Sequence, residues 1–305
     1  MLSQRLLFGT LLLAAFFGLF WLDAWLEPAA SRSEAVVAAT SNWVTHLQRG
    51  FVVSCVCAIL LAVAARELVQ LMRGGGHHPF AAWVVGCVAG FAMLPWGLSV
   101  AGVSMPVVSE ALTLGVLIAA GGALACAARR PQPEKAASDA VFSLFVIVYL
   151  GVLGSYVPRL RLAAETPWVV IYVVLVIKSC DIFAYFTGMA LGRHKLIPRL
   201  SPKKTIEGLA GGVLGAMLVA AGLSALFRDL SPAADGVWPG FVPALVFGGL
   251  MALIGQAGDL FESLIKRGVG AKDSAAVVPA FGGILDLIDS VLPCAPAAYW
   301  MLVGW

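Results

Sequence analysis

Long apolar stretches separated by short polar segments run through the whole sequence. Nine of them can be traced, at about residues 6–22, 51–65, 80–101, 107–127, 140–157, 168–187, 206–227, 241–258 and 284–305. A helix of roughly 20 residues crosses the ~30 Å hydrocarbon core of a bilayer, and these runs approach that length. The pattern therefore predicts an all-α, polytopic helical membrane protein with about nine transmembrane helices.

The composition agrees with this pattern. Of the 305 residues, 60% are hydrophobic and 12% are charged, and the mean hydropathy is +0.92. These values exclude a soluble globular protein. The net charge of +3 is too small to indicate a nucleic-acid partner, so none is expected. The six cysteines are scattered through apolar runs without a CxxC pair, which indicates neither a disulfide framework nor a zinc site.

The first run also resembles a cleaved signal peptide, since a single Arg5 precedes it. We expect a retained helix instead, because the letters WLDAWLEP follow and contain no clear small-residue cleavage site. Charged motifs gather in the second half of the chain. We therefore divide it into N-terminal membrane helices, 1–165, and a membrane catalytic region, 166–305.

Acidic residues between the last two apolar runs supply the first candidate chemistry. Asp259 and Glu262 are three residues apart, as are Asp286 and Asp289, so on helices each pair would share a face. A charge in mid-bilayer costs about 2.5–3.5 kcal/mol, so such a cluster at a membrane edge indicates a functional site. Two carboxylate pairs at two helix ends can bind a divalent metal through oxygen ligands.

Basic residues accompany these carboxylates. Lys266, Arg267 and Lys272 lie on the connection between the two acidic pairs and could bind phosphates. Further cations occupy the loop after the sixth run: Arg193, Lys195, Arg199, Lys203 and Lys204. Pro202 in this loop suits a rigid turn that starts the next helix, with Thr205 as its cap.

Three ordered motifs resemble those of the phosphatidate cytidylyltransferases, the CDP-diacylglycerol synthases. The longest, S-L-I-K-R-x4-K-D-S-x4-P-x2-G-G-I-L-D-x-I-D, covers Ser263–Asp289. The other two are D-x-x-A-Y-x-x-G at Asp181–Gly188 and S-P-x-K-T-x-E-G at Ser201–Gly208. Three positions depart from the family pattern: Phe281 replaces a histidine, Leu287 replaces an arginine, and Ala275 stands where a glycine is common.

The resemblance implies a metal-assisted reaction of CTP with phosphatidate that gives CDP-diacylglycerol and pyrophosphate. It implies Mg²⁺ as cofactor, with a second metal ion left open, and CTP, phosphatidate and membrane lipid as partners; a homodimer is also left open. The catalytic candidates are Asp259, Asp286, Lys266 and Asp289. The metal candidates are Asp259, Asp286, Asp181 and Glu262. The candidates for binding the nucleotide are Ser201, Lys203, Lys204, Thr205, Arg267 and Lys272.

Two other functions remain open. One is a related CTP-using enzyme that acts on another lipid, such as a prenol kinase or a CDP-archaeol synthase. The other is a catalytically dead lipid-binding relative, which the changes at Phe281 and Leu287 would favour. A transporter is disfavoured, because the charges gather near the ends of the apolar runs and not at their centres.

Small residues and loop charges make two further predictions. In the seventh run, Gly208 and Gly212, like Gly211 and Gly215, have the four-residue spacing that lets helices pack closely in lipid.

With nine spans, alternate loops lie on the same side of the membrane. The side whose loops hold the motifs contains thirteen Lys and Arg, and the other side contains six. Lys and Arg favour cytoplasmic loops. We therefore expect an integral protein of a bacterial-type inner (cell) membrane, with the N-terminus outside and the active site on the cytoplasmic face.

Overall fold

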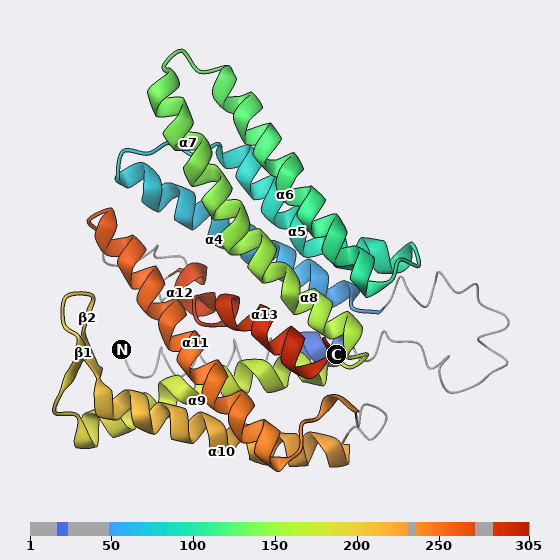
Figure 1. Ribbon diagram of the computed structural model, residues 1–305, viewed down its shortest axis with the longest axis vertical. Helices are drawn as coiled ribbons and strands as arrows, with labels where there is room; N and C mark the ends of the chain where they lie inside the picture. Colours follow the sequence, from blue (N-terminus) through green and yellow to red (C-terminus); the bar gives the residue numbers. More distant parts are fainter. Residues whose placement is uncertain (1–16, 24–48, 231–235, 272–282, 305) are drawn as a thin grey trace, which may run out of the picture. The chain divides into compact units, whose positions relative to one another are not determined.

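A computed structural model describes residues 17–23, 49–230, 236–271 and 283–304 of the chain (Figure 1). The chain forms two compact units. In the described part, the first unit comprises the residues up to 163 together with 283–285, and the second comprises 164–271 and 286–304. Within these residues, seven helices are long and apolar enough to cross a membrane. The prediction of a polytopic helical membrane protein is confirmed.

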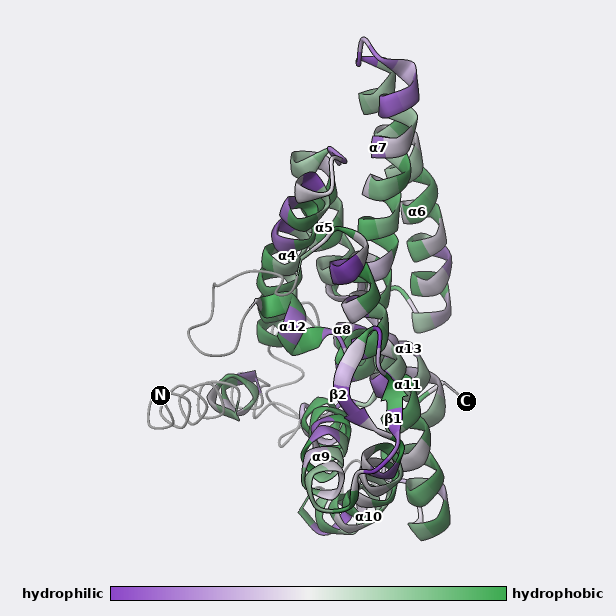
Figure 2. Cartoon of the chain, turned by 90° about the vertical axis from the view of Figure 1, so that its left-hand side faces the viewer, coloured by the Kyte–Doolittle hydropathy of each residue, from purple (hydrophilic) through white to green (hydrophobic). Residues whose placement is uncertain are grey.

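The first unit is a set of packed membrane-length helices. Its elements are α4 (Phe51–Gly74), α5 (Ala81–Val100), α6 (Met105–Ala128), α7 (Pro133–Val146), the π-helical segment η2 (Ile147–Val152) and α8 (Leu153–Ala163). The last three form one continuous span, and α5 packs against α4, α6 and α8. The helices are mostly hydrophobic along their length, and hydrophilic residues gather at the loop between α6 and α7 (Figure 2).

Buried charges in the first unit have partners. Arg161 Nε lies 2.6 Å from Asp23 Oδ2, and both side chains are fully buried. Glu67, on the polar last turns of α4, accepts hydrogen bonds from the backbone N–H groups of Ile284 (3.0 Å) and Leu285 (2.9 Å). This carboxylate therefore caps the start of α12 (Ile284–Ile288).

The second unit contains α9 (Trp168–Leu191), α10 (Ile206–Leu230), α11 (Phe241–Gly268) and α13 (Val291–Leu302). A short antiparallel hairpin, β1 (Lys195–Ile197) and β2 (Ser201–Thr205), connects α9 to α10. The sequence pattern predicted a loop at this place. The hairpin turns through Pro198–Leu200, and Leu200 N–H donates to the Ile197 carbonyl at 3.1 Å.

Glycines bring α9 and α10 into close contact, as their spacing predicted. A Cβ at Gly208 would lie 2.8 Å from the Ala184 carbonyl oxygen, and one at Gly212 would lie 2.8 Å from the Cys180 carbonyl oxygen. Any larger residue would push the two helix backbones apart. The prediction of helix packing through these small residues is confirmed.

Stacked aromatic rings form the centre of the second unit away from its charged end. Tyr172 of α9 stacks on Phe247 of α11 at 5.3 Å between ring centroids, and Phe227 of α10 stacks on Trp238 at 5.2 Å. The Tyr172 hydroxyl donates to the Ala220 carbonyl at 3.3 Å, which satisfies its buried polar group. This core fixes the three long helices that carry the site.

The helix limits differ from the apolar runs at several points. Helices α4, α9 and α11 continue through polar turns that the runs exclude, and α5 continues through Pro95. The ninth run is divided into α12 and α13, and α13 has only 12 residues. Most of the first run lies outside the described residues, so the total of nine spans stays a prediction.

Candidate active site

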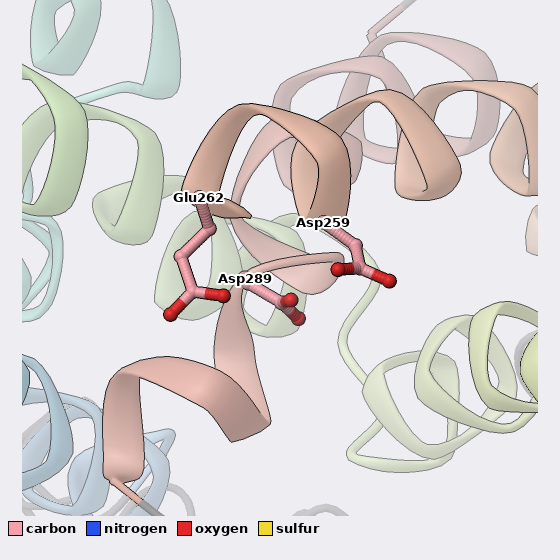
Figure 3. Close-up of side chains that lie close together, drawn as sticks. All are labelled: Asp259, Glu262 and Asp289. Carbon is pink, nitrogen blue, oxygen red and sulfur yellow. The ribbon is translucent and has the colours of Figure 1, made fainter. Parts of the chain in front are cut away.

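Three carboxylates meet at one end of the second unit. Asp259 and Glu262 project from α11, and Asp289 lies in the turn between α12 and α13. One oxygen from each lies within 4.8 Å of the others. Figure 3 shows the Asp289 carboxylate between the other two. Oxygen atoms gathered in this way are the donor set that Mg²⁺ and similar hard cations prefer.

Local backbone structure explains this convergence. Asp259 and Glu262 share a helical face, as their spacing predicted. Helix α12 ends at Ile288, so Asp289 lies beyond it and does not share a helical face with Asp286. Gly258 allows the turn to approach α11, because a Cβ there would lie 2.6 Å from the Asp289 carbonyl oxygen and 2.6 Å from Pro293 Cγ.

Lys266 bridges two of the predicted carboxylates. Its ammonium group donates to Glu262 Oε2 and to Asp286 Oδ1, each at 2.8 Å. The Glu262 side chain is only 1% exposed, and its other oxygen, Oε1, is buried without a hydrogen-bonding partner among the described residues. A buried carboxylate oxygen of this kind is costly unless it has a ligand, so it supports a cation site here.

A second lysine approaches from the hairpin. Lys204 of β2 forms an ion pair with Asp259 Oδ2 and donates to Gln256 Oε1 at 2.9 Å. Gln256 Nε2 in turn donates to Asp181 Oδ1 at 3.0 Å. One amide therefore links the lysine of the hairpin to the aspartate of α9, and both groups lie beside the carboxylate cluster.

A third lysine lies on α9. Lys178 donates to Ser290 Oγ at 2.8 Å and lies 3.7 Å from Asp181 Oδ2.

The surroundings of Asp289 change its pKa. This residue lies in a turn outside the seven long helices, and the charge of Lys178 acts on it. Burial raises the pKa of Asp289 to about 6; the positive charge of Lys178 opposes this shift, and the negative charge of Asp259 adds to it.

The remaining predicted residues lie at the edge of the site or beyond it. Ser201 and Lys203 lie on β2, where Lys203 is exposed. Thr205 is buried, and its hydroxyl oxygen accepts the Gly208 N–H at 3.1 Å, which confirms its predicted role as a helix cap. Arg267 donates to the Ala271 carbonyl at 3.2 Å. Lys272 and Phe281 lie outside the described residues.

Sequence reasoning missed three residues of this network. Gln256 precedes the long motif, Ser290 directly follows it, and Lys178 lies in the sixth apolar run; the sequence assigned a site role to none of them. The available signal for Lys178 and Gln256 is the cost of a polar group inside an apolar helix, which requires a partner. Ser290 lies in the turn before α13 and gives no such signal. Their partners on other elements are 52 to 112 residues away in the chain, and local spacing does not reveal them.

Membrane helices that end in a carboxylate cluster surrounded by lysines define a membrane protein with a candidate metal and phosphate site. Residues 29–304 match the Cytidylyltransferase family, and the chain belongs to that family. It is 36% identical over 165 residues to the phosphatidate cytidylyltransferase of Staphylococcus epidermidis, covering 54% of this chain and 60% of that protein. It is 35% identical over 162 residues to the phosphatidate cytidylyltransferase of Bacillus subtilis, covering 53% and 57%.

A third relative is more similar over a shorter stretch. The phosphatidate cytidylyltransferase of Brucella abortus is 45% identical over 130 residues, covering 43% of this chain and 45% of that protein. The aligned stretches thus span about half to three fifths of the length of these curated relatives.

Proposed function

We propose that this protein transfers the cytidylyl group of CTP to phosphatidate, releasing pyrophosphate and leaving CDP-diacylglycerol in the membrane. The observation that carries the proposal is the cluster of Asp259, Glu262 and Asp289 in a chain of the Cytidylyltransferase family. Family membership and the names of the relatives support the choice of substrates.

The side chains fit a divalent cation. The ligand atoms are all carboxylate oxygens, and Oε1 of Glu262 is buried without a hydrogen-bonding partner among the described residues. We propose Asp259, Glu262 and Asp289 as the holders of Mg²⁺, with Asp286 and Asp181 acting through Lys266 and Gln256. When bound, the cation would supply Lewis-acid stabilisation of the charge on the transferring and leaving phosphates.

The reaction requires little covalent chemistry from the protein. A phosphate oxygen of phosphatidate forms a bond to the α-phosphorus of CTP, and the bond from that phosphorus to the bridging oxygen of the β-phosphate breaks. Pyrophosphate leaves with that oxygen. The protein must align the two phosphates and balance their charge, which is how most phosphoryl-transfer enzymes work.

The lysines suit these tasks. Lys266 is fixed between two carboxylates and can hold a phosphate oxygen beside Glu262. Lys204 lies beside the carboxylates and Lys203 is exposed; we propose that these two residues and Arg267 bind the triphosphate. Lys178 would balance charge beside α9. The apolar helices would hold the acyl chains of phosphatidate in lipid.

The charge distribution of the loops supports an orientation. We propose that the N-terminus faces outward and that the hairpin and the end of α11 face the cytoplasm, where CTP is available. The membrane would be the inner (cell) membrane of a bacterial-type cell.

Product formation tests the activity directly. Purified protein in detergent receives CTP labelled at the α-phosphate, Mg²⁺ and phosphatidate, and the lipid fraction is examined for a nucleotide-linked lipid. We expect product with the wild type and none with Asp259→Asn, because an amide is a poor Mg²⁺ ligand. Asp229→Asn makes the same chemical change at an exposed residue near the end of α10 and serves as the matched control.

The other outcomes have defined meanings. Transfer to a different lipid in place of phosphatidate would identify a related CTP-using enzyme. Absence of transfer to any lipid, from a folded protein that still binds phosphatidate, would identify a lipid-binding relative and reject the proposal.

A further inference from the structure

Lys204 contacts one of the carboxylates that would hold a metal ion. Its ammonium group forms an ion pair with Asp259, one of the three clustered carboxylates, and the pair is only partly buried, with 21% and 30% of the two side chains exposed. A divalent cation on Asp259 and a lysine ammonium on the same carboxylate repel each other. The two cations therefore compete for Asp259.

Lys204 has a second partner besides Asp259. It is the penultimate residue of β2, its side chain is partly exposed, and it is also held by Gln256 Oε1 at 2.9 Å. Gln256 is oriented by its own bond to Asp181 Oδ1 at 3.0 Å. When Lys204 leaves Asp259, Gln256 keeps its ammonium group within reach of the cluster.

We propose that Lys204 is an exchangeable counter-ion that couples metal binding to nucleotide binding. It neutralises Asp259 when the carboxylates hold no cation. On metal binding, Lys204 is released from Asp259 and becomes available to a phosphate of the nucleotide. This inference rests on the proposed function for the identity of the nucleotide, and its metal half can be tested without it.

Removing Lys204 should change the metal affinity in opposite directions if this residue competes with the metal and if it only supports Asp259. If Lys204 only braced Asp259, removing it would weaken metal binding. If it competes, Lys204→Met should bind Mn²⁺ more tightly than the wild type when nucleotide is absent. We expect a gain of about three- to thirtyfold, the range between an exposed ion pair and a charge-assisted hydrogen bond.

Nucleotide binding should change in the other direction. With Mn²⁺ bound, Lys204→Met should bind CTP several-fold more weakly than the wild type, because one phosphate partner is lost. In the wild type, CTP and Mn²⁺ should each strengthen the binding of the other, and by linkage the two factors must be equal. Direct contact between metal and phosphate would survive in Lys204→Met, so the coupling should shrink there without vanishing.

The experiment measures Mn²⁺ and CTP affinities of the full chain in detergent, by electron paramagnetic resonance for Mn²⁺ and by calorimetry for CTP. Lys204→Arg keeps the charge and should retain the wild-type Mn²⁺ affinity to within a few-fold. Lys195→Met removes a cation from the paired strand β1 and should leave Mn²⁺ affinity unchanged. If Lys204→Met does not fold, Lys204→Gln makes the same prediction with a smaller change in polarity.

If folded Lys204→Met or Lys204→Gln binds Mn²⁺ as tightly as the wild type or more weakly, the proposed exchange between Lys204 and the metal is overturned. Failure of the wild type to bind CTP would reject the proposed function and leave the Mn²⁺ comparison valid. The two failures are therefore distinguishable.

Discussion

Gly258→Ala probes the close approach on which the carboxylate cluster depends. The added Cβ would lie 2.6 Å from the Asp289 carbonyl oxygen and 2.6 Å from Pro293 Cγ. Non-bonded carbon atoms pack best at about 3.5–4.0 Å, so the turn or α11 must move by roughly 1 Å. Neither a backbone carbonyl nor a proline ring can rotate away, so the displacement should be transmitted to Asp289.

The effect on stability should be modest and the effect on function large. Overpacking costs about 1–3 kcal/mol, and replacing glycine by alanine within a helix returns up to about 1 kcal/mol. The free energy of unfolding should therefore fall by about 0–3 kcal/mol. A shift of ~1 Å at a reacting centre can cost about 10²-fold in rate, and we expect Mn²⁺ affinity to fall by about tenfold or more for the same geometric reason.

Gly249→Ala is the matched control on the same helix. Its Cβ would lie 3.5 Å from Met217 Cγ, an ordinary contact with a flexible side chain, so stability and Mn²⁺ affinity should be retained. Both variants are compared with the wild type by thermal unfolding, Mn²⁺ titration and turnover in detergent. Wild-type Mn²⁺ affinity and turnover in Gly258→Ala would refute the argument that this approach positions Asp289.

Three further predictions concern other parts of the chain. A single cysteine at Lys203, in a cysteine-free background, should resist an impermeant thiol reagent in intact cells and react once the membrane is opened; labelling from outside would reverse the proposed orientation. The double change Phe281→His and Leu287→Arg should alter turnover by the equivalent of about 1–3 kcal/mol, the scale of a charged hydrogen bond, and a gain of activity from none would show that the natural chain is inactive. Glu67→Ala should lower the free energy of unfolding by about 1.5–3 kcal/mol, because two backbone N–H groups lose a charged acceptor, whereas the exposed Glu134→Ala should change it by about 0.5 kcal/mol or less.

Hydrophobic pattern alone predicted most of the fold. Seven of the nine apolar runs correspond to membrane-length helices in the described part of the chain, because length and apolarity suffice to define a transmembrane helix. Helix ends were less predictable. Polar turns such as the one that contains Glu67 stay helical because tertiary partners satisfy their side chains, and composition does not report such partners.

The candidate site was only partly accessible to the same reasoning. Spacing placed Asp259 and Glu262 together because both lie on one regular helix. The same rule does not apply to Asp286 and Asp289, because α12 ends between them. Asp286 contacts Lys266, and Asp289 joins the cluster of three carboxylates. A short helix followed by a turn leaves no periodic signal from which this division could be read.

Charge balance links the site to its proposed ligands. The network contains five carboxylates (Asp181, Asp259, Glu262, Asp286 and Asp289) and three lysines (Lys178, Lys204 and Lys266). With all of them ionised, the group carries an excess of two negative charges, which one divalent cation would neutralise. Partial burial makes an uncompensated excess costly. A site that also accepts a triphosphate then needs cations that can change partners, and among these lysines Lys204 lies on the short hairpin and not on a membrane helix. In our proposal, Lys204 therefore neutralises Asp259 when no cation is bound and becomes available to a phosphate when one is.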